Sequence, residues 1–402
     1  RNDRHGSCYQ ALWVLSGHLL FKKGAHRSMT TRYPSFAGDI LDLFAERAAM
    51  LTDIDIIQPA DPFLDMAGED LRRRIFLTES ETGKSLCLRP EFTIPVCLDH
   101  IRTRAATPRR YAYLGEVFRQ RREGGAEFFQ AGIEDLGAND EAEADARALA
   151  DAHAILSRVL PGHSLHITLG DQAVFEAVLS ALGLPRGWQK RLARTFGTPA
   201  MLETVIGEFI DPPVAPVSLP QELTDLAAQR DKARLTQYID EQMQAAGLSP
   251  VSGRLPAEIA QRLIEKAELE SVRLSGRALD ALKAFLAINV PLKEAEERLT
   301  AFASEARIVL DEALAGFGAR MEQIKTYGLP LERIRYDAAF GRPLDYYTGF
   351  VFEIRAEGHP QPLAGGGRYD RLLTLLGAEH PIPGVGFSVW LDRVTTLREE
   401  TR

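Results

Sequence analysis

The sequence is organised around residues 341–353, which read GRPLDYYTGFVFE. Arg342 supplies a cation, Asp345 an anion, and Tyr346 and Tyr347 two amphipathic rings, all directly before an apolar run that predicts a strand. These groups have the chemistry to bind a small polar ligand. An ordinary strand with tyrosines at its mouth fits the stretch equally well, so the rest of the chain must decide between the two interpretations.

Composition places the chain among globular proteins. With 402 residues, 45% of them hydrophobic, it can bury a full core and is long enough for two structural units. The formal net charge of −8 argues against a protein whose main task is to bind a phosphate backbone. Cys8, Cys87 and Cys97 are spaced for neither a disulfide framework nor a zinc site, so we expect a reducing, cytoplasmic location.

Residues 1–28 differ from the rest of the chain. They begin without Met, and their largely apolar run at 11–20 is too short to span a bilayer. No small-residue cleavage pattern follows this run. The segment is typical of a vector-derived or untranslated leader ahead of a natural start at Met29, with a targeting peptide as the alternative.

The first part of the predicted core covers residues 29–183. Periodicity predicts a helix and three short strands, at 35–52, 55–59, 74–79 and 84–88, of which the last two form a hairpin. The sequence LRPEFT follows at 88–93, and Pro95 suits the first turn of a helix that ends near Ile101. We therefore expect Glu91 and Thr93 in the turn just before that helix.

A long antiparallel hairpin is predicted next, with strands at 109–122 and 127–134 around a turn at 123–126. Side chains alternate along a strand, so Gln130 and Glu134 point to the same face of the return strand. An amide and a carboxylate four residues apart suit a polar ligand. A solvated polar face is the alternative. Beyond the hairpin, helices are predicted from Asn139 to Leu160 and after Asp171, on either side of a strand at 164–170.

A mostly helical insertion is predicted at 184–329, in which we recognise no motif that carries chemistry. The second part of the core, 330–402, begins with strands at 334–340 and 350–355. A glycine run at 365–367 is then expected to open a helix through Leu376, with backbone N–H groups free to face a ligand. The last strand, at 384–390, leads into a C-terminal helix.

Taken in this order, the segments resemble the catalytic domain of class II aminoacyl-tRNA synthetases, and the histidyl enzyme in particular. The matching segments are LRPEFT at 88–93, VFR at 117–119, Gln130, Glu134, Arg342 with LDYY at 344–347, GGRYD at 366–370, and Arg393. The resemblance implies an α+β fold in which an antiparallel sheet is flanked by helices.

The residues that the resemblance implies for histidine binding are Glu91, Thr93, Arg119, Gln130, Glu134, Arg342, Tyr346 and Tyr347. Carboxylate, amide and hydroxyl oxygens can accept from an ammonium, and an arginine can meet a carboxylate. Glu134 with a tyrosine can bond an imidazole. No metal or cofactor is implied.

The departures from the synthetase pattern concern the nucleotide. Arg121 stands where the second class motif, Phe-Arg-x-Glu, has its adenine-reading Glu. Trp390 stands where the third motif, Gly-x-Glu-Arg, has Gly, and Pro343 and Phe92 also replace glycines. No anticodon-binding domain is recognised after Arg393. These changes predict the loss of histidine activation by ATP and of tRNA charging.

A chain with these features is similar to the regulatory subunits of short-form ATP phosphoribosyltransferases. That resemblance implies a non-catalytic protein that activates a short catalytic subunit and mediates feedback inhibition by histidine, as a homodimer within a hetero-oligomer, without a membrane or tRNA partner. Two alternatives stay open: an enzyme that activates histidine with ATP, favoured by Arg119 and Arg393, and a tRNA-binding adaptor.

Overall fold

A computed structural model describes residues 33–66, 68–121, 125–210, 220–246, 255–271, 276–344 and 346–400. Several expectations lie outside these residues: the leader at 1–28, the start at Met29, Cys8, part of the turn at 123–126, and Asp345.

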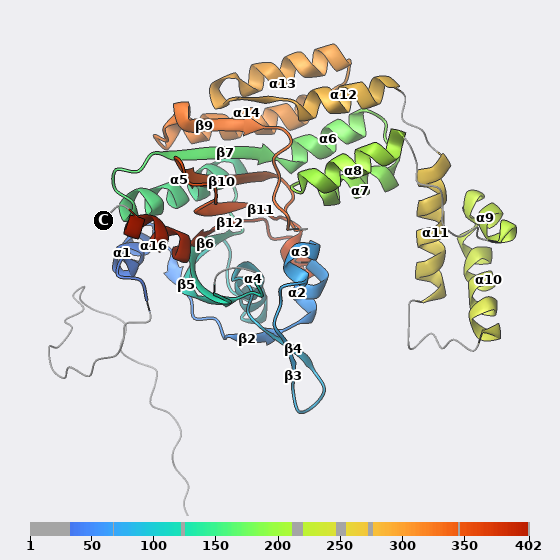
Figure 1. The fold of residues 1–402 in the computed structure, drawn as a ribbon, viewed down its shortest axis with the longest axis horizontal. Coiled ribbons are helices and arrows are strands. Elements are labelled where there is room, and N and C mark those ends of the chain that lie inside the picture. The colour runs from blue at the N-terminus through green and yellow to red at the C-terminus, as the bar shows by residue number, and fades with distance from the viewer. Residues whose placement is uncertain are drawn as a thin grey trace, which may run out of the picture. The chain divides into compact units, whose positions relative to one another are not determined.

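One large sheet forms the centre of the fold. Its strands are β1 (Met50–Leu51), β5 (Arg109–Phe118), β6 (Glu127–Leu136), β7 (Leu165–Asp171), β8 (Asn289–Pro291), β9 (Ile334–Asp337), β10 (Phe350–Ala356), β11 (Ala364–Arg368) and β12 (Gly384–Trp390). Within the described ranges their order is β1-β5-β6-β12-β11-β10-β7-β9-β8 (Figure 1). Neighbours from β5 to β7 pair antiparallel, whereas β1 with β5 and β7 with β9 pair parallel. The predicted α+β fold is confirmed, with a mixed sheet in place of a purely antiparallel one.

Sixteen helices are found in the described part of the chain. They are α1 (Ala37–Glu46), α2 (Asp61–Met66), α3 (Gly68–Arg72), α4 (Thr93–Arg102), α5 (Glu141–Val159), α6 (Gln172–Ala181), α7 (Arg186–Thr195), α8 (Pro199–Ile210), α9 (Gln221–Ala228), α10 (Lys232–Ala245), α11 (Pro256–Ser271), α12 (Gly276–Leu286), α13 (Leu292–Ala306), α14 (Asp311–Thr326), α15 (Leu372–Leu375) and α16 (Leu391–Glu400). The helix predicted at 35–52 ends early, at Glu46, because Ala48 has a positive φ of 50° and the chain then enters β1.

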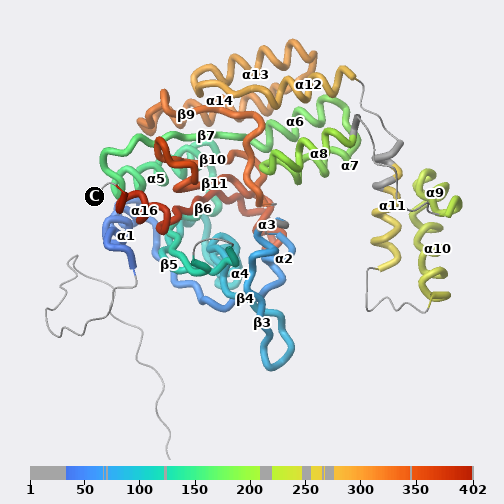
Figure 2. Tube along the Cα trace, in the orientation of Figure 1, coloured from blue at the N-terminus to red at the C-terminus, as the bar shows by residue number. Residues whose placement is uncertain are grey.

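The two faces of the sheet belong to different cores, because side chains alternate along each strand. On β12, Val385, Phe387 and Val389 join the core that contains α5, while Trp390 joins the core that contains α4. Strand β6, from the first part of the sequence, pairs with β12, near the end of the sequence, and Gly386 lies opposite Glu134. In Figure 2 the green-blue trace of β6 accordingly lies beside red segments from the end of the chain. Gln130 and Glu134 share a face of β6 with Phe128 and Leu136 of the α4-side core, whereas Asp135 pairs with Arg147 of α5 on the other side.

A small three-stranded sheet extends the α4 side. Its strands are β2 (Ile57–Pro59), β3 (Leu77–Glu79) and β4 (Ser85–Leu88), in the order β2-β4-β3. The predicted hairpin is confirmed, since Leu77 lies opposite Cys87 in an antiparallel pair. Cys87 and Cys97 are both free thiols, and both are buried.

The prediction for the glycine run is wrong. Gly365, Gly366 and Gly367 lie within β11, a central and fully buried strand, and the short helix α15 begins only at Leu372. The glycines are needed for close packing: a Cβ on Gly366 would lie 2.2 Å from the carbonyl oxygen of Gly386, and one on Gly365 would lie 2.0 Å from Nη1 of Arg342. Their backbone groups pair with the neighbouring strands β10 and β12, so they do not form an open anion-binding loop.

The segment 184–329 contributes to more than one core. Residues of α7, α8 and α12 to α14 belong to the large core, and β8 pairs with β9 in the main sheet. The helices α9, α10 and α11 have their own small core around Leu235 and Ala260. The boundaries at 184 and 329 remain a prediction.

A buried charge network ties the elements together. Asp145 of α5 accepts from Arg320 at 2.7 Å and from Arg368 at 2.7 Å. Arg320 also donates to one carboxylate oxygen of Asp171, at 2.5 Å. The other oxygen of Asp171 caps the N-terminus of α6. Because all four side chains are at least 90% buried, the pairs hold α5, α6, α14 and β11 in one arrangement.

Candidate functional site

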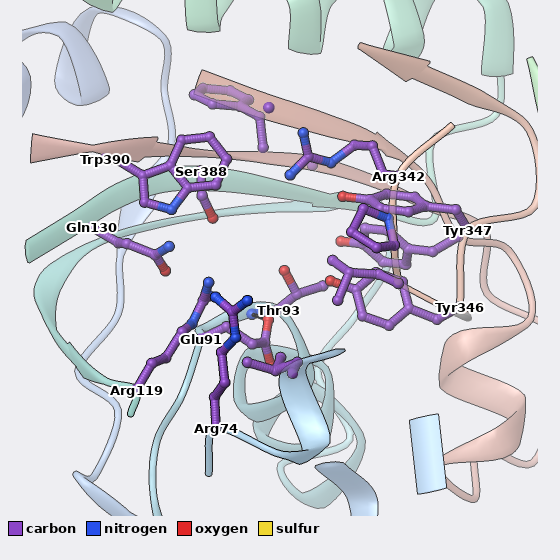
Figure 3. Close-up of a pocket in the computed structure, with 17 residues that line it drawn as sticks. Arg74, Glu91, Thr93, Arg119, Gln130, Arg342, Tyr346, Tyr347, Ser388 and Trp390 are labelled. Atoms are coloured by element: carbon purple, nitrogen blue, oxygen red, sulfur yellow. Dashed lines mark hydrogen bonds between the residues drawn. The ribbon is translucent and has the colours of Figure 1, made fainter. Parts of the chain in front are cut away.

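A cavity of about 90 Å³ opens on the α4 side of the sheet (Figure 3). A cavity of about 10–15 Å³ on the same measure holds one water, so this one accommodates a molecule of several water-sized groups. Both the sheet and the segment before β10 contribute to its wall.

Seven of the eight residues predicted for histidine binding line this cavity: Glu91, Thr93, Arg119, Gln130, Arg342, Tyr346 and Tyr347. They come from the start of α4, the end of β5, the middle of β6 and the segment that links β9 to β10. The eighth, Glu134, does not line the cavity but contacts Thr93, which does. Residues separated by more than 200 positions in the sequence thus meet around one space.

Glu91 organises the start of α4. Its two carboxylate oxygens accept from the backbone N–H groups of Thr93 at 2.6 Å and Ile94 at 3.0 Å, which have no partner within the helix. Thr93 is therefore the first residue of α4, and the expectation that it precedes the helix is wrong. Burial raises the pKa of Glu91, although these donors and Arg119 oppose the shift.

Glu134 lies behind Thr93 in a fully buried position. It accepts from the Thr93 hydroxyl at 2.7 Å and from the Tyr369 hydroxyl, and the Tyr113 hydroxyl lies 3.4 Å away. Burial raises its pKa to about 8, even though these hydroxyls favour the charged form. A Cβ on Gly386 would lie 1.8 Å from Glu134, so glycine at this position of β12 makes room for the carboxylate.

Gln130 presents an unpartnered acceptor to the cavity. Its side chain is 1% exposed, and Oε1 has no hydrogen-bond partner among the described residues. A buried amide oxygen without a partner costs free energy unless a ligand or water satisfies it. Gln130 is thus suited to accept from a ligand such as an ammonium group.

Arg119 faces the same space. Its Nε donates to the carbonyl oxygen of Pro90 at 2.7 Å, and Figure 3 shows its guanidinium beside that of Arg74, with both pointing into the cavity. Burial lowers the pKa of Arg119 to about 10, which still leaves it charged at neutral pH. The two arginines can meet a ligand carboxylate.

Arg342 is held at the opposite wall. Its Nη1 donates to Glu353 at 2.9 Å, and its Nε has no partner among the described residues. Tyr346 and Tyr347 pack beside it with ring centroids 5.0 Å apart, and both are 5% exposed. The stretch that opened the sequence analysis therefore supplies one whole wall of the cavity.

Four polar residues in or beside the cavity were not predicted from the sequence. Tyr369 and Tyr113 contact Glu134, Ser388 lies 2.7 Å from the Tyr113 hydroxyl, and Arg74 lines the cavity. Tyr369 stands in the matched segment GGRYD, and Ser388 shares a face of β12 with Gly384 and Gly386, so both had a signal in the pattern.

Trp390 occupies the side of the cavity next to Gln130 (Figure 3). The indole is 7% exposed, and the guanidinium groups of Arg393 and Arg342 lie 4.5 and 5.5 Å from its ring centroid. Arg393 also donates to the carbonyl oxygen of Pro362. The arginine that matches the third class motif is therefore engaged by this chain's own groups.

The arrangement combines acceptors, cations and aromatic rings around an amino-acid-sized space. Such groups can bind an ammonium, a carboxylate and a polar ring. Among the described residues, no group of three or more His, Cys, Asp or Glu side chains is placed to hold a metal ion. Within the same residues, no helix has the length and apolar character needed to cross a membrane.

Comparisons with known proteins agree with the fold. A family model described as histidyl-tRNA synthetase matches residues 35–246 and 221–394. A crystal structure of an ATP phosphoribosyltransferase regulatory subunit/histidyl-tRNA synthetase from Bacillus halodurans has a TM-score of 0.58 at 20% identity, covering 93% of this chain and 83% of that one. At this identity the likeness concerns the fold, and it confirms the predicted synthetase-like architecture.

Sequence relatives are much more similar. An ATP phosphoribosyltransferase regulatory subunit of Chelativorans sp. (strain BNC1) is 74% identical over 372 residues, which is 92% of this chain and 100% of that protein. A protein of the same name from Mesorhizobium japonicum is 65% identical over 371 residues, covering 92% of this chain and 99% of that protein.

Proposed function

The chain belongs to the family of ATP phosphoribosyltransferase regulatory subunits, and from this premise we propose that it activates a short-form catalytic subunit and mediates its feedback inhibition by histidine. In this proposal the chain is not itself a catalyst, it acts in the cytoplasm in the first step of histidine biosynthesis, and its pocket senses the end product.

Trp390 is the observation that carries the proposal. The indole lines the cavity between Arg342 and Arg393, where the synthetase motif has a glycine. The cavity keeps its acceptors and cations, while the indole occupies space that the glycine of the motif would leave open. A site of this kind supports binding of histidine without its activation by ATP.

Histidine fits the remaining groups. Gln130 and Glu91 offer oxygens to the ammonium, and Arg119 offers a guanidinium to the carboxylate. The Tyr369 hydroxyl lines the cavity and donates to the buried Glu134, so its oxygen can accept from the imidazole N–H. Charge-assisted hydrogen bonds contribute roughly 1.5–3 kcal/mol each. After ordering costs, a few of them support micromolar affinity, about −8 kcal/mol.

Inhibition requires histidine to bind the less active arrangement of the complex more tightly. A coupling of about 1–3 kcal/mol suffices. Arg342, Leu344, Tyr346 and Tyr347 suit this role, because they line the cavity and lie outside the described strands and helices.

We also propose a homodimer within the hetero-oligomer. Strand β1 pairs only with β5 among the described strands, so it is an edge strand. Its Met50 and Leu51 are 42% and 56% exposed. An apolar edge strand favours pairing with another chain, and Leu51→Lys should shift a sedimentation profile from dimer to monomer if β1 lies in the dimer interface.

The function is tested with the purified chain, with and without a short-form catalytic subunit. We expect the chain to co-purify with that subunit, to raise its phosphoribosyl transfer, and to make it sensitive to histidine. The alternative, a histidine-activating enzyme, is favoured by the presence of Arg119 and Arg393. It predicts histidine-dependent pyrophosphate exchange by the chain alone, and robust exchange would overturn the proposal.

The position of the histidine site is tested separately. Calorimetric titration with histidine should release heat with the chain alone and much less with Glu134→Ala. Absence of heat in both cases would place the inhibitory site elsewhere, such as an interface with the catalytic subunit.

A further inference from the structure

A second, larger cavity lies next to the first. Its volume is about 490 Å³, and its lining comes mainly from α6, α7 and the segment before β10. Arg342, Leu344 and Tyr346 line both cavities, so the two are neighbours across these three residues.

The larger cavity is strongly cationic. Its five basic side chains are Arg186, Lys190, Arg194, Arg342 and Arg371, against a single carboxylate. The three from α7 are spaced four residues apart, which places them on one face of the helix. In a chain of net charge −8, such a concentration of positive charge is a local feature of this wall.

Three of these five cations lack a carboxylate partner among the described residues, whereas Arg342 pairs with Glu353 at 2.9 Å. In the part of the chain that the structure describes, no carboxylate lies within 4.0 Å of the charged nitrogens of Arg186, Lys190 or Arg194. By contrast, Arg191 on the same helix does not line the cavity and pairs with Glu208. The one carboxylate in the lining, Glu176, lies 3.9 Å from Arg371.

We propose that this cavity, the α7 cleft, binds a small ligand with two or three adjacent phosphate groups. Arginine guanidinium groups match phosphate oxygens in pairs, and a lysine adds a point charge. The volume falls in the range of small-molecule pockets, of about 300–1,000 Å³. Leu344, Tyr346 and Phe196 offer apolar and aromatic surface for the rest of such a ligand. Inorganic polyphosphate and nucleoside triphosphates share this chemistry.

The shared wall predicts coupling between the two cavities. Arg342 and Tyr346 line both cavities, so a ligand that contacts them from the α7 cleft changes their position, or the electrostatic potential around them, in the smaller cavity as well. By linkage, a ligand in one cavity then changes affinity in the other, and the factor is the same in both directions. The α7 cleft itself is independent of whether histidine binds in the smaller cavity.

The test is a calorimetric titration of the full chain with inorganic tripolyphosphate at low salt, without histidine. The variant Arg186→Gln/Lys190→Gln/Arg194→Gln removes three charges from the cleft. Its matched control, Lys293→Gln/Arg298→Gln/Lys325→Gln, removes three charges from exposed positions of α13 and α14. Circular dichroism and thermal unfolding establish that both variants fold.

We expect tripolyphosphate to bind the wild type, at least about tenfold more weakly to the cleft variant, and within about twofold of wild type to the control. A titration of the wild type with ATP identifies the source of the phosphates. If ATP and tripolyphosphate bind with equal affinity, the cleft recognises the phosphates alone. If ATP binds more tightly and the cleft variant loses this binding, the ligand is a nucleoside triphosphate. No binding to the wild type, or equal loss in both variants, overturns the proposal. Binding of a polyglutamate peptide without tripolyphosphate binding overturns it in favour of an acidic protein segment.

Discussion

Arg121 and Asp392 form an ion pair in which Nη1 lies 2.9 Å from Oδ2, joining the residues after β5 to the first turn of α16. The guanidinium of Arg121 also lies 3.4 Å from the ring centroid of Phe128. The synthetase motifs that these positions resemble have Glu where Arg121 stands. The resemblance therefore predicts that this pair and Trp390 occupy the space in which a synthetase reads adenine.

Restoring the synthetase residues should reopen that space. The variant Arg121→Glu/Trp390→Gly/Asp392→Glu removes the ion pair and the indole. We expect adenosine to bind this variant with a measurable heat in calorimetry and not to bind the wild type. Adenosine carries no phosphate and so does not report on the α7 cleft. Tight binding of adenosine to the wild type would contradict the idea that this space is filled.

Gln130→Leu should weaken histidine binding roughly ten- to hundredfold, because a hydrogen bond to a charged group contributes about 1.5–3 kcal/mol. The free protein should be as stable as wild type or more so, since the substitution removes a buried acceptor without a partner. Calorimetry and urea unfolding measure the two effects. As a control, Gln237→Leu on the exposed side of α10 should leave histidine affinity unchanged.

The pKa of Glu134 predicts a pH dependence of stability. Burial raises it from 4.5 to about 8, so between these values the native state holds a proton that the unfolded chain has released. Stability therefore falls as pH rises through this window, by up to about 1.4 kcal/mol per pH unit for one proton. Glu134→Gln should remove this part of the slope in urea unfolding between pH 5 and 9. An identical slope in the variant would show that Glu134 does not titrate in this way.

Gly365→Ala should disturb the cavity wall more than the fold. The added methyl would lie 2.0 Å from Nη1 of Arg342 and would displace the guanidinium from Glu353. We expect weaker histidine binding by calorimetry and a lower melting temperature. Gly316→Ala is the matched control, because nothing lies within 4 Å of its Cβ position in α14. This control should stabilise the protein by about 0.5–1 kcal/mol through its helix preference.

Asp145→Ala should destabilise the fold by about 3–5 kcal/mol, since it leaves Arg320 and Arg368 buried without their shared partner. Urea unfolding measures the loss. Asp240→Ala, on a helix surface of α10, should change the unfolding free energy by less than about 0.5 kcal/mol. Equal effects of the two substitutions would mean that the buried network contributes little.

Local pattern predicted several parts of the site correctly. Alternation along β6 placed Gln130 and Glu134 on one face, and both lie on the α4 side of the sheet. Alternation does not predict how deeply each side chain on that face is buried. Gln130 reaches the cavity, whereas Glu134 is covered by Thr93. The glycines of β11 were misinterpreted because glycine has no side chain and therefore no pattern that distinguishes a loop from a tightly packed central strand.

The sequence by itself determined the α+β class, most of the elements, the family and seven of the residues that line the cavity, because those signals are periodicities and short motifs within a few residues. The tertiary structure alone decided which groups meet across the chain. Arg121 reaches Asp392 over 271 positions, and α7 turns three of its cations towards Arg342 and Tyr346. Such contacts depend on which face of each element packs inward, and that is settled only when both cores close on the sheet.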